Sequence, residues 1–133
     1  MHFYLTNIKL SVMISEVIAM ERIVRQGLLY DFYGVLLTEH QRKIYEDVVF
    51  QDLSISEIAR EVGISRQGVH DLVKRCDKIL ESYEDRLGLV EKFERTKESV
   101  RSIHQMIREY KETGDADLIE RIENAAVQIL ELS

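Results

Sequence analysis

The sequence has no proline, no tryptophan, one cysteine and only six glycines among its 133 residues. Without proline, the few glycines are the main positions that can interrupt a helix, so long helices are favoured. A single cysteine, Cys76, excludes an internal disulfide, and no cluster of cysteine and histidine has metal-ligand spacing. We therefore expect no metal, no cofactor and a reducing, cytoplasmic setting.

Patterns typical of enzymes and membrane proteins are also missing. The chain has no glycine-rich phosphate loop, no nucleophile elbow and no metal motif, so we expect no catalysis. No uninterrupted run of about 18 apolar residues is present, which argues against a membrane span. The apolar start lacks a basic leader and would make a poor signal peptide.

The composition that remains is that of a folded helical protein. Apolar residues make up 45% of the chain and charged residues 32%, enough for one buried core, and strong helix formers dominate. The expected fold class is all-α. The formal net charge is −6, which is unusual for a chain that binds nucleic acid.

Helical periodicity begins near Met20. From there to about Leu37, apolar residues recur at three- and four-residue steps and predict one core-facing stripe of Ile23, Val24, Leu28, Phe32, Val35 and Leu36. Thr38 and Gln41 then have the spacing of a capping box, in which two side chains satisfy the first turn of a helix. Ile44, Val48 and Val49 supply the apolar face of that second helix.

The stretch "SEIAREVGISRQGV" predicts two helices joined at a glycine. Ser54 and Glu57 form a second candidate capping box, Gly63 suits a left-handed helix end, and Ser65 is placed to cap a longer helix from Arg66. A helix-turn-helix needs a small residue at the crossing, a glycine four positions later and a β-branched residue six positions after that. Ala59, Gly63 and Val69 meet this spacing, and the flanking apolar positions are filled by Ile58, Val62, Ile64 and Leu72.

The second of these helices would be the recognition helix. Ser65, Arg66, Gln67 and His70 are candidates for base or groove contacts, and Lys74 and Arg75 for phosphate contacts. The alternative is an ordinary solvated helix surface, because Ser54–Arg75 carries four basic and three acidic residues, and Asp71 would repel phosphate. The aromatic "LLYDFYG" stretch is interpreted as packing rather than base stacking, because no basic groove accompanies it.

The C-terminal third predicts two antiparallel helices. Val100, Ile103, Met106, Ile107 and Tyr110 form one apolar stripe, closed by Gly114, and Leu118 to Leu130 form another. Gly88 marks the break before them. These stripes either complete the core or form a dimer seam, and we expect a homodimer, since one weakly basic module would hold a duplex poorly.

Longer segments carry a family resemblance. "LLTEHQRKIYEDVVFQDLSISEIAREVGISRQGVHDLVKR" is similar to the promoter-reading region of bacterial sigma factors, and "LLYDFYGVLLTEHQR" with "SRQGVHDLVKRCDKILESYEDRLGLVEKF" resembles the YlxM family of small helix-turn-helix proteins. The resemblance covers about Met20 to Phe93. It implies a regulatory or accessory role linked to the signal recognition particle.

These expectations divide the chain into three segments and leave three candidate functions. Residues 1–19 would be an upstream extension, because members of this family usually begin where Met20 stands; residues 20–93 would form the helix-turn-helix domain and 94–133 the C-terminal pair. Three functions stay open: a regulator that reads duplex DNA, an accessory that contacts the RNA or protein of the signal recognition particle, and a protein-interaction module without nucleic-acid binding.

Overall fold

The computed structural model describes residues 2–133, and every regular element in that range is helical. The expected all-α, helix-turn-helix fold is therefore confirmed. The chain forms two compact units, one ending at Leu87 and one spanning Gly88–Ser133. In chain order the elements are α1 (His2–Tyr33), the 3-10 turn η1 (Gly34–Leu36), α2 (Glu39–Tyr45), the π-helical turn η2 (Glu46–Phe50), α3 (Ile55–Val62), α4 (Arg66–Leu87), α5 (Leu89–Thr113) and α6 (Asp117–Leu132).

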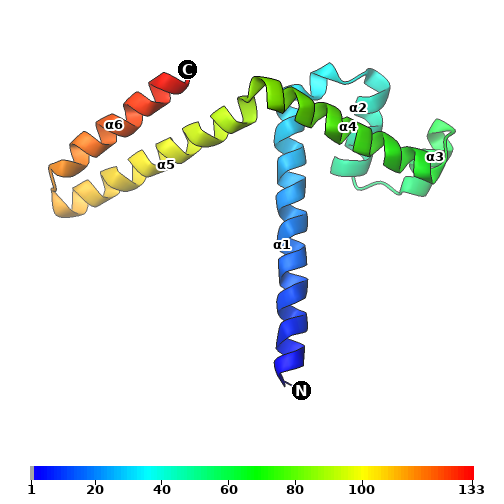
Figure 1. The fold of residues 1–133 in the computed structure, drawn as a ribbon, viewed down its shortest axis with the longest axis horizontal. Helices are drawn as coiled ribbons and strands as arrows, with labels where there is room; N and C mark the ends of the chain where they lie inside the picture. Colours follow the sequence, from blue (N-terminus) through cyan, green and yellow to red (C-terminus); the bar gives the residue numbers. More distant parts are fainter. Residues whose placement is uncertain (1) are drawn as a thin grey trace. The chain divides into compact units, whose positions relative to one another are not determined.

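The first unit is built around α4. Figure 1 shows α2 and α3 beside α4, with the C-terminal part of α1 reaching the same helix. A buried cluster of Ile44, Ile58, Ala59 and Val69 joins α2, α3 and α4. Because each of these short helices buries only one apolar stripe, none would be stable alone, and α4 supplies the common surface.

Two of the three predicted helix starts are confirmed. The Thr38 hydroxyl accepts a hydrogen bond from the Gln41 amide at 3.2 Å, and the Gln41 side chain accepts one from the Thr38 amide at 3.0 Å. The Ser65 hydroxyl accepts one from the Gly68 amide at 2.9 Å. The Ser54 capping box is wrong: its side chain makes no cap hydrogen bond, and the first turn of α3 is closed by the backbone bond from Ile58 to Ser54.

The predicted core stripe of the first helix is wrong at four of its six positions, and only Leu28 and Phe32 are partly buried. Ile23, Val24, Val35 and Leu36 are at least half exposed, whereas Leu29, Tyr33 and Leu37 are buried. The α-helix ends at Tyr33 and continues as a 3-10 turn, which changes the angular step between side chains and turns Leu37, rather than Val35 or Leu36, inward.

The N-terminal half of α1 is helical from His2 and exposes its apolar side chains, among them Phe3, Leu10 and Ile18. By length and composition alone, the helix that runs from His2 to Leu36 is apolar enough to cross a membrane. Signal sequences and buried core helices meet the same criterion, so this composition identifies no membrane protein by itself. Met1, the first residue of the expected extension, lies outside the described residues.

The second unit is a helical hairpin. Its two helices, α5 and α6, pack along most of their length, with Met106 and Leu118 buried and Ile103, Ile122 and Ile129 half-buried between them. Gly114 closes α5 as predicted: it adopts a left-handed backbone (φ 65°), and its amide donates to the Tyr110 carbonyl at 2.7 Å. Gly88, which precedes α5, is also left-handed.

Candidate nucleic-acid interface

The turn between α3 and α4 is set by Gly63. Its backbone is left-handed (φ 80°, ψ 29°), and the amides of Gly63 and Ile64 both donate to the Ala59 carbonyl, at 2.9 and 3.0 Å. A Cβ atom at this position would meet no other atom, so glycine is favoured here by backbone conformation and not by crowding. The turn brings α3 across α4 at a close distance.

The side chains at that crossing are the apolar residues of the motif. Ile58, Ala59 and Val69 are buried in one cluster, and Val62 and Leu72 pack against it. A small residue is needed at position 59 because the two helix backbones approach there. Ile64, which the sequence placed in the same motif core, is 37% exposed and lies at the edge of the turn.

The candidate contact residues all lie on exposed positions at the start of α4. Arg66, Gln67, His70, Lys74 and Arg75 are exposed. Gln67 and Lys74 lie opposite the buried Val69 and Cys76, and the other three lie on the flanks of the helix. Ser65 is exposed as well, but its hydroxyl is already engaged as the helix cap. The structure thus brings five of these side chains onto one accessible surface, and gives Ser65 a structural role next to it.

Gln67 and Asp71 interact within this surface. The Gln67 side-chain amide donates to Oδ1 of Asp71 at 2.9 Å, one helical turn away. The bond holds the Gln67 side chain along the helix and leaves its carbonyl oxygen free to accept. The bond also keeps the Asp71 carboxylate next to Gln67, the residue best suited to contact an adenine edge. The negative charge of that carboxylate repels a phosphate group that approaches this surface.

Sequence analysis missed one basic residue. Lys78 is exposed and lies one turn after Lys74 on the same side of α4. Between Arg66 and Lys78, α4 therefore exposes four basic side chains and only one carboxylate, Asp71. The other acidic residue of this stretch, Asp77, faces the interior of the unit. The outer surface of α4 is more basic than the composition of the motif indicates.

Further along α4, polar contacts with α1 and α2 hold the unit together. The Tyr45 hydroxyl donates to Asp77 at 2.6 Å, and the Gln26 amide donates to both Asp77 oxygens at 3.1 and 3.2 Å. One turn later, Arg25 forms a two-pronged ion pair with Glu81, at 2.8 and 3.0 Å. Burial and the Asp77 carboxylate both raise the pKa of Tyr45, so its hydroxyl stays protonated as a donor.

The aromatic residues of "LLYDFYG" take part in the same packing. Tyr30 stacks on Tyr45 with ring centroids 5.7 Å apart, and its hydroxyl donates to Glu46. Tyr33 is buried and donates to the buried carboxylate of Glu84 at 2.6 Å. Burial, followed by the Glu46 hydrogen bond, raises the pKa of Tyr30 to about 12. These rings fix α1 against its neighbours, in agreement with the packing interpretation.

Two further groups bear on possible chemistry. Cys76 is fully buried, and burial raises the pKa of its thiol to about 11, so a nucleophilic thiolate does not form at neutral pH. Within residues 2–133, no group of three or more histidine, cysteine, aspartate or glutamate side chains is arranged to hold a metal ion.

Comparison with known proteins places these features in a family. Residues 20–124 match the family model described as "Putative helix-turn-helix protein, YlxM / p13 like". This chain belongs to that family. It is 39% identical over 105 residues to the UPF0122 protein of Clostridium kluyveri, a match that covers 79% of this chain and 95% of the relative.

Other relatives agree with this assignment. The UPF0122 protein of a Thermoanaerobacter species is 41% identical over 107 residues, covering 80% of this chain and 92% of the relative. The UPF0122 protein of Bacillus thuringiensis is 39% identical over 106 residues, covering 78% and 96%. The matched region includes the whole helix-turn-helix and most of the α5–α6 hairpin. The family is one of helix-turn-helix proteins and is not a known enzyme family.

Proposed function

We propose that this YlxM-like protein is a regulatory protein that binds nucleic acid through the outer surface of α4. The observation that carries the proposal is the basic, exposed side of that helix at the end of a tightly packed helix-turn-helix. Arg66, Gln67 and His70 would contact base edges or the groove, and Lys74, Arg75 and the newly identified Lys78 would contact phosphates. Ser65 would act by fixing the start of the helix.

The affinity of a single helix-turn-helix module for nucleic acid should be modest. Each phosphate contact made by lysine or arginine releases counterions, and this term supplies most sequence-independent affinity. Three such contacts fall below the six to ten or so that strongly binding proteins make. The chain's net charge of −6 adds a repulsive long-range field.

The partner that we favour belongs to the signal recognition particle system in the cytoplasm. Support comes from the resemblance to the YlxM family and from the modest charge of α4, which suits a dedicated partner better than general DNA binding. The alternative is an accessory that contacts the RNA or protein of the particle without reading duplex DNA. The exposed carboxylate of Asp71 favours this alternative, because it opposes close docking on a duplex.

Salt dependence tests nucleic-acid binding. The full chain would be titrated against labelled promoter duplexes and against the RNA of the particle, over a series of salt concentrations. Replacement of Lys74 and Arg75 by alanine should weaken binding to all sequences and lower the salt slope by about one for each lost phosphate contact. Lys92 and Arg121, which are exposed on the hairpin, provide the matched control pair: their replacement by alanine removes the same charge and should leave the slope unchanged.

Competition between the two nucleic acids separates the partners. Preferential displacement by the particle's RNA supports the accessory function, and preferential displacement by promoter DNA supports duplex reading. If the wild-type chain shows no salt-dependent binding to either nucleic acid, while it binds the particle's protein, the protein-interaction function replaces this proposal.

A further inference from the structure

The α5–α6 hairpin exposes an apolar stripe on each helix, in addition to the seam that holds the helices together. On α5, Val100 and Ile107 are 52% and 38% exposed; on α6, Ile119 and Leu130 are 52% and 73% exposed, with the small Ala126 between them. The spacing of seven residues from Val100 to Ile107, and from Ile119 to Ala126, repeats after two helical turns. Each stripe therefore runs straight along its helix.

The two stripes lie on the same face of the hairpin. At 100° per residue, Val100 and Ile107 lie about a quarter turn from the seam residues Ile103 and Met106. Ile119, Ala126 and Leu130 lie about a quarter turn from Leu118 and Ile122. Because the helices run in opposite directions, these two rotations point to the same side. The hairpin thus has one face on which both helices expose apolar side chains, with the exposed His104 between Val100 and Ile107 on α5.

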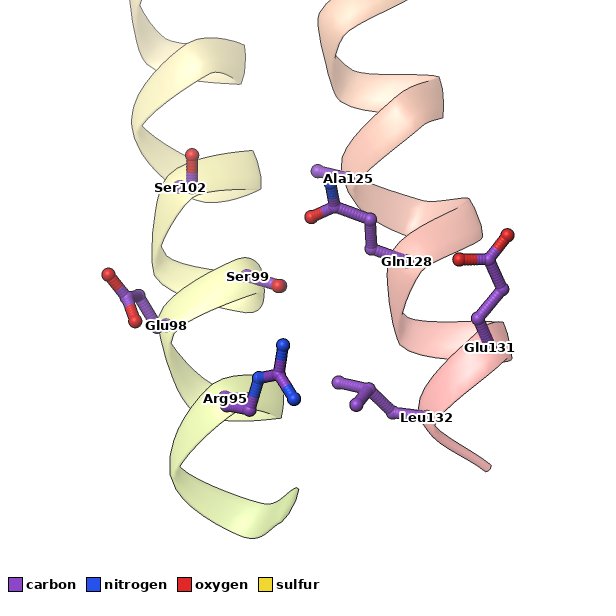
Figure 2. Close-up of a pocket in the computed structure, with 8 residues that line it drawn as sticks. All are labelled: Arg95, Glu98, Ser99, Ser102, Ala125, Gln128, Glu131 and Leu132. Atoms are coloured by element: carbon purple, nitrogen blue, oxygen red, sulfur yellow. The ribbon is translucent and has the colours of Figure 1, made fainter. Parts of the chain in front are cut away.

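The other face of the hairpin is polar. A groove of about 580 Å³ lies between the helices. It is lined mainly by Arg95, Glu98, Ser99 and Ser102 from α5 and by Gln128 and Glu131 from α6 (Figure 2). In that view Arg95 points toward Leu132 at the bottom of the groove. A hairpin that is apolar on one face and polar on the other is half of a four-helix bundle.

Charged residues beside the apolar stripes differ between the two helices. Next to its stripe, α5 carries the bases Lys97, Arg101, Arg108 and Lys111, with Glu94 and Glu112 further round the helix. Next to its stripe, α6 carries Glu120 and Glu123, and its one base, Arg121, lies on the other side. The margin of α5 is therefore mainly positive and the margin of α6 negative.

We propose that a second copy of this chain covers the apolar face, with α5 of each copy packed antiparallel against α6 of the other. A two-fold symmetric dimer of hairpins can place α5 either on α5 or on α6 of its partner. The first arrangement would bring the two basic margins together, and also the two acidic ones. The second pairs each basic margin with an acidic one, so charge complementarity selects it.

This arrangement fixes the register without further assumptions. Its symmetry axis is parallel to the helices, so each residue keeps its height along the bundle. Since the hairpin turns at Gly114, Val100 is level with the end of α6 and would sit between Ala126 and Leu130 of the partner. Ile107 would sit between Ile119 and Ala126 of the partner, in a knobs-into-holes pattern. The small Ala126 leaves room for both larger side chains.

The proposed dimer does not depend on nucleic-acid binding by α4. It would, however, double the number of basic α4 surfaces in one assembly, which addresses the small charge of a single module. Its failure and the failure of the proposed function are distinguishable, because oligomeric state is measured without any ligand.

Sedimentation of the full chain at micromolar concentration tests whether the apolar face of the hairpin forms a dimer interface. The wild-type chain should sediment as a dimer, and Leu130→Glu should sediment as a monomer with unchanged helix content, because Leu130 is 73% exposed in the single chain. Gln128→Glu adds the same charge on the polar face and should stay dimeric. A monomeric wild-type chain, or a dimeric Leu130→Glu variant, would overturn the proposal.

Cysteine cross-linking tests the pairing of the helices. Val100→Cys combined with Leu130→Cys should form disulfide-linked dimers under mild oxidation, because these positions are level and face each other across the proposed interface. Val100→Cys combined with Ile107→Cys should cross-link only if α5 packs on α5, and that result would overturn the α5–α6 pairing. The wild-type chain is the control, since its only thiol, Cys76, is buried.

Discussion

The hydroxyl of Tyr45 donates a hydrogen bond of 2.6 Å to Asp77, which ties α2 to the inner side of α4. Asp77 also accepts from Gln26 of α1, so one carboxylate joins three helices directly behind the candidate interface. Tyr30 with Glu46 and Tyr33 with Glu84 repeat the same pairing of a phenol with a carboxylate. Tyr33 and Tyr45 therefore fix α4 against α1 and α2, and Tyr30 fixes α1 against η2.

Removal of the Tyr45 hydroxyl should destabilise the protein. We expect Tyr45→Phe to lower the free energy of unfolding by about 1 to 3 kcal/mol, because a buried hydrogen bond to a charged acceptor is lost. Urea denaturation followed by circular dichroism measures the change. Tyr110→Phe removes a hydroxyl from a 39% exposed ring and should alter the free energy of unfolding little; equal losses in both variants would contradict the assigned role of Tyr45.

Stability should fall at alkaline pH. The pKa values of Cys76 and Tyr30 are raised to about 11 and about 12, and that of Tyr45 is raised further. In each case the folded chain holds its proton at a pH where the unfolded chain releases it, so the stabilisation is complete below about pH 9 and is lost as pH rises through the folded values. Thermal midpoints measured from pH 8 to 12 should decline from about pH 9 upward. A midpoint that is constant up to pH 12 would show that these groups titrate normally.

The crossing of α3 and α4 should not accept a larger side chain. Ala59→Leu should cost about 1 to 3 kcal/mol, because the added atoms must fit into a cluster that already buries Ile58 and Val69. The neighbouring Arg60 is exposed, and Arg60→Leu provides the control on the same helix. An Ala59→Leu variant that melts at the wild-type temperature would mean that the helices are not closely packed there.

The turn glycine should be needed for its backbone conformation. We expect Gly63→Ala to cost about 1 to 2 kcal/mol, the penalty for a left-handed residue with a Cβ. Gly63→Asn should cost less, since asparagine tolerates this region, and the space around the position is open. Chemical denaturation of the two variants gives the ranking, and a larger loss for asparagine would indicate crowding instead of backbone strain.

Removal of the carboxylate from the α4 surface should strengthen nucleic-acid binding. Asp71→Asn removes the one exposed negative charge between Arg66 and Lys78 while it keeps an oxygen that can accept from Gln67. We expect affinity to rise about two- to fivefold at low salt, the effect of one surface charge near phosphate. Fluorescence anisotropy measures the affinity. Unchanged or weaker binding would argue that Asp71 itself contacts the ligand, as a cytosine acceptor would.

The features that sequence analysis predicted correctly depend on neighbouring residues. The cap at Thr38, the left-handed Gly63 and the close of α5 at Gly114 each involve residues within four positions of one another. The core stripe of α1 was wrong at Val35 and Leu36 because a short 3-10 turn at Gly34 changed the helical phase, and periodicity assumes a constant step. Ile23 and Val24 precede that turn, and they are exposed because no other helix within residues 2–133 covers their side of α1. The Tyr33 to Glu84 pair joins residues 51 positions apart, and no local pattern predicts such a contact.

In the candidate interface too, sequence predicted the local features and missed those that depend on contacts between distant residues. The motif spacing located the start of α4, but it did not show that Asp77 and Glu81 pair with residues of α1 and α2 while Lys78 faces outward. A sum of charges along the sequence counts both sides of a helix together. Only packing against α1 and α2 separates them.

This separation of the two sides of α4 has a consequence for how the family can evolve. Residues that hold the fold, such as Val69 and Cys76, occupy one side of the helix, and the exposed Gln67, Lys74 and Lys78 occupy the other. Mutations on the exposed side carry little cost in folding and are therefore open to selection for a new target. Duplicated genes with this architecture can diverge in what they recognise while they inherit one unchanged scaffold.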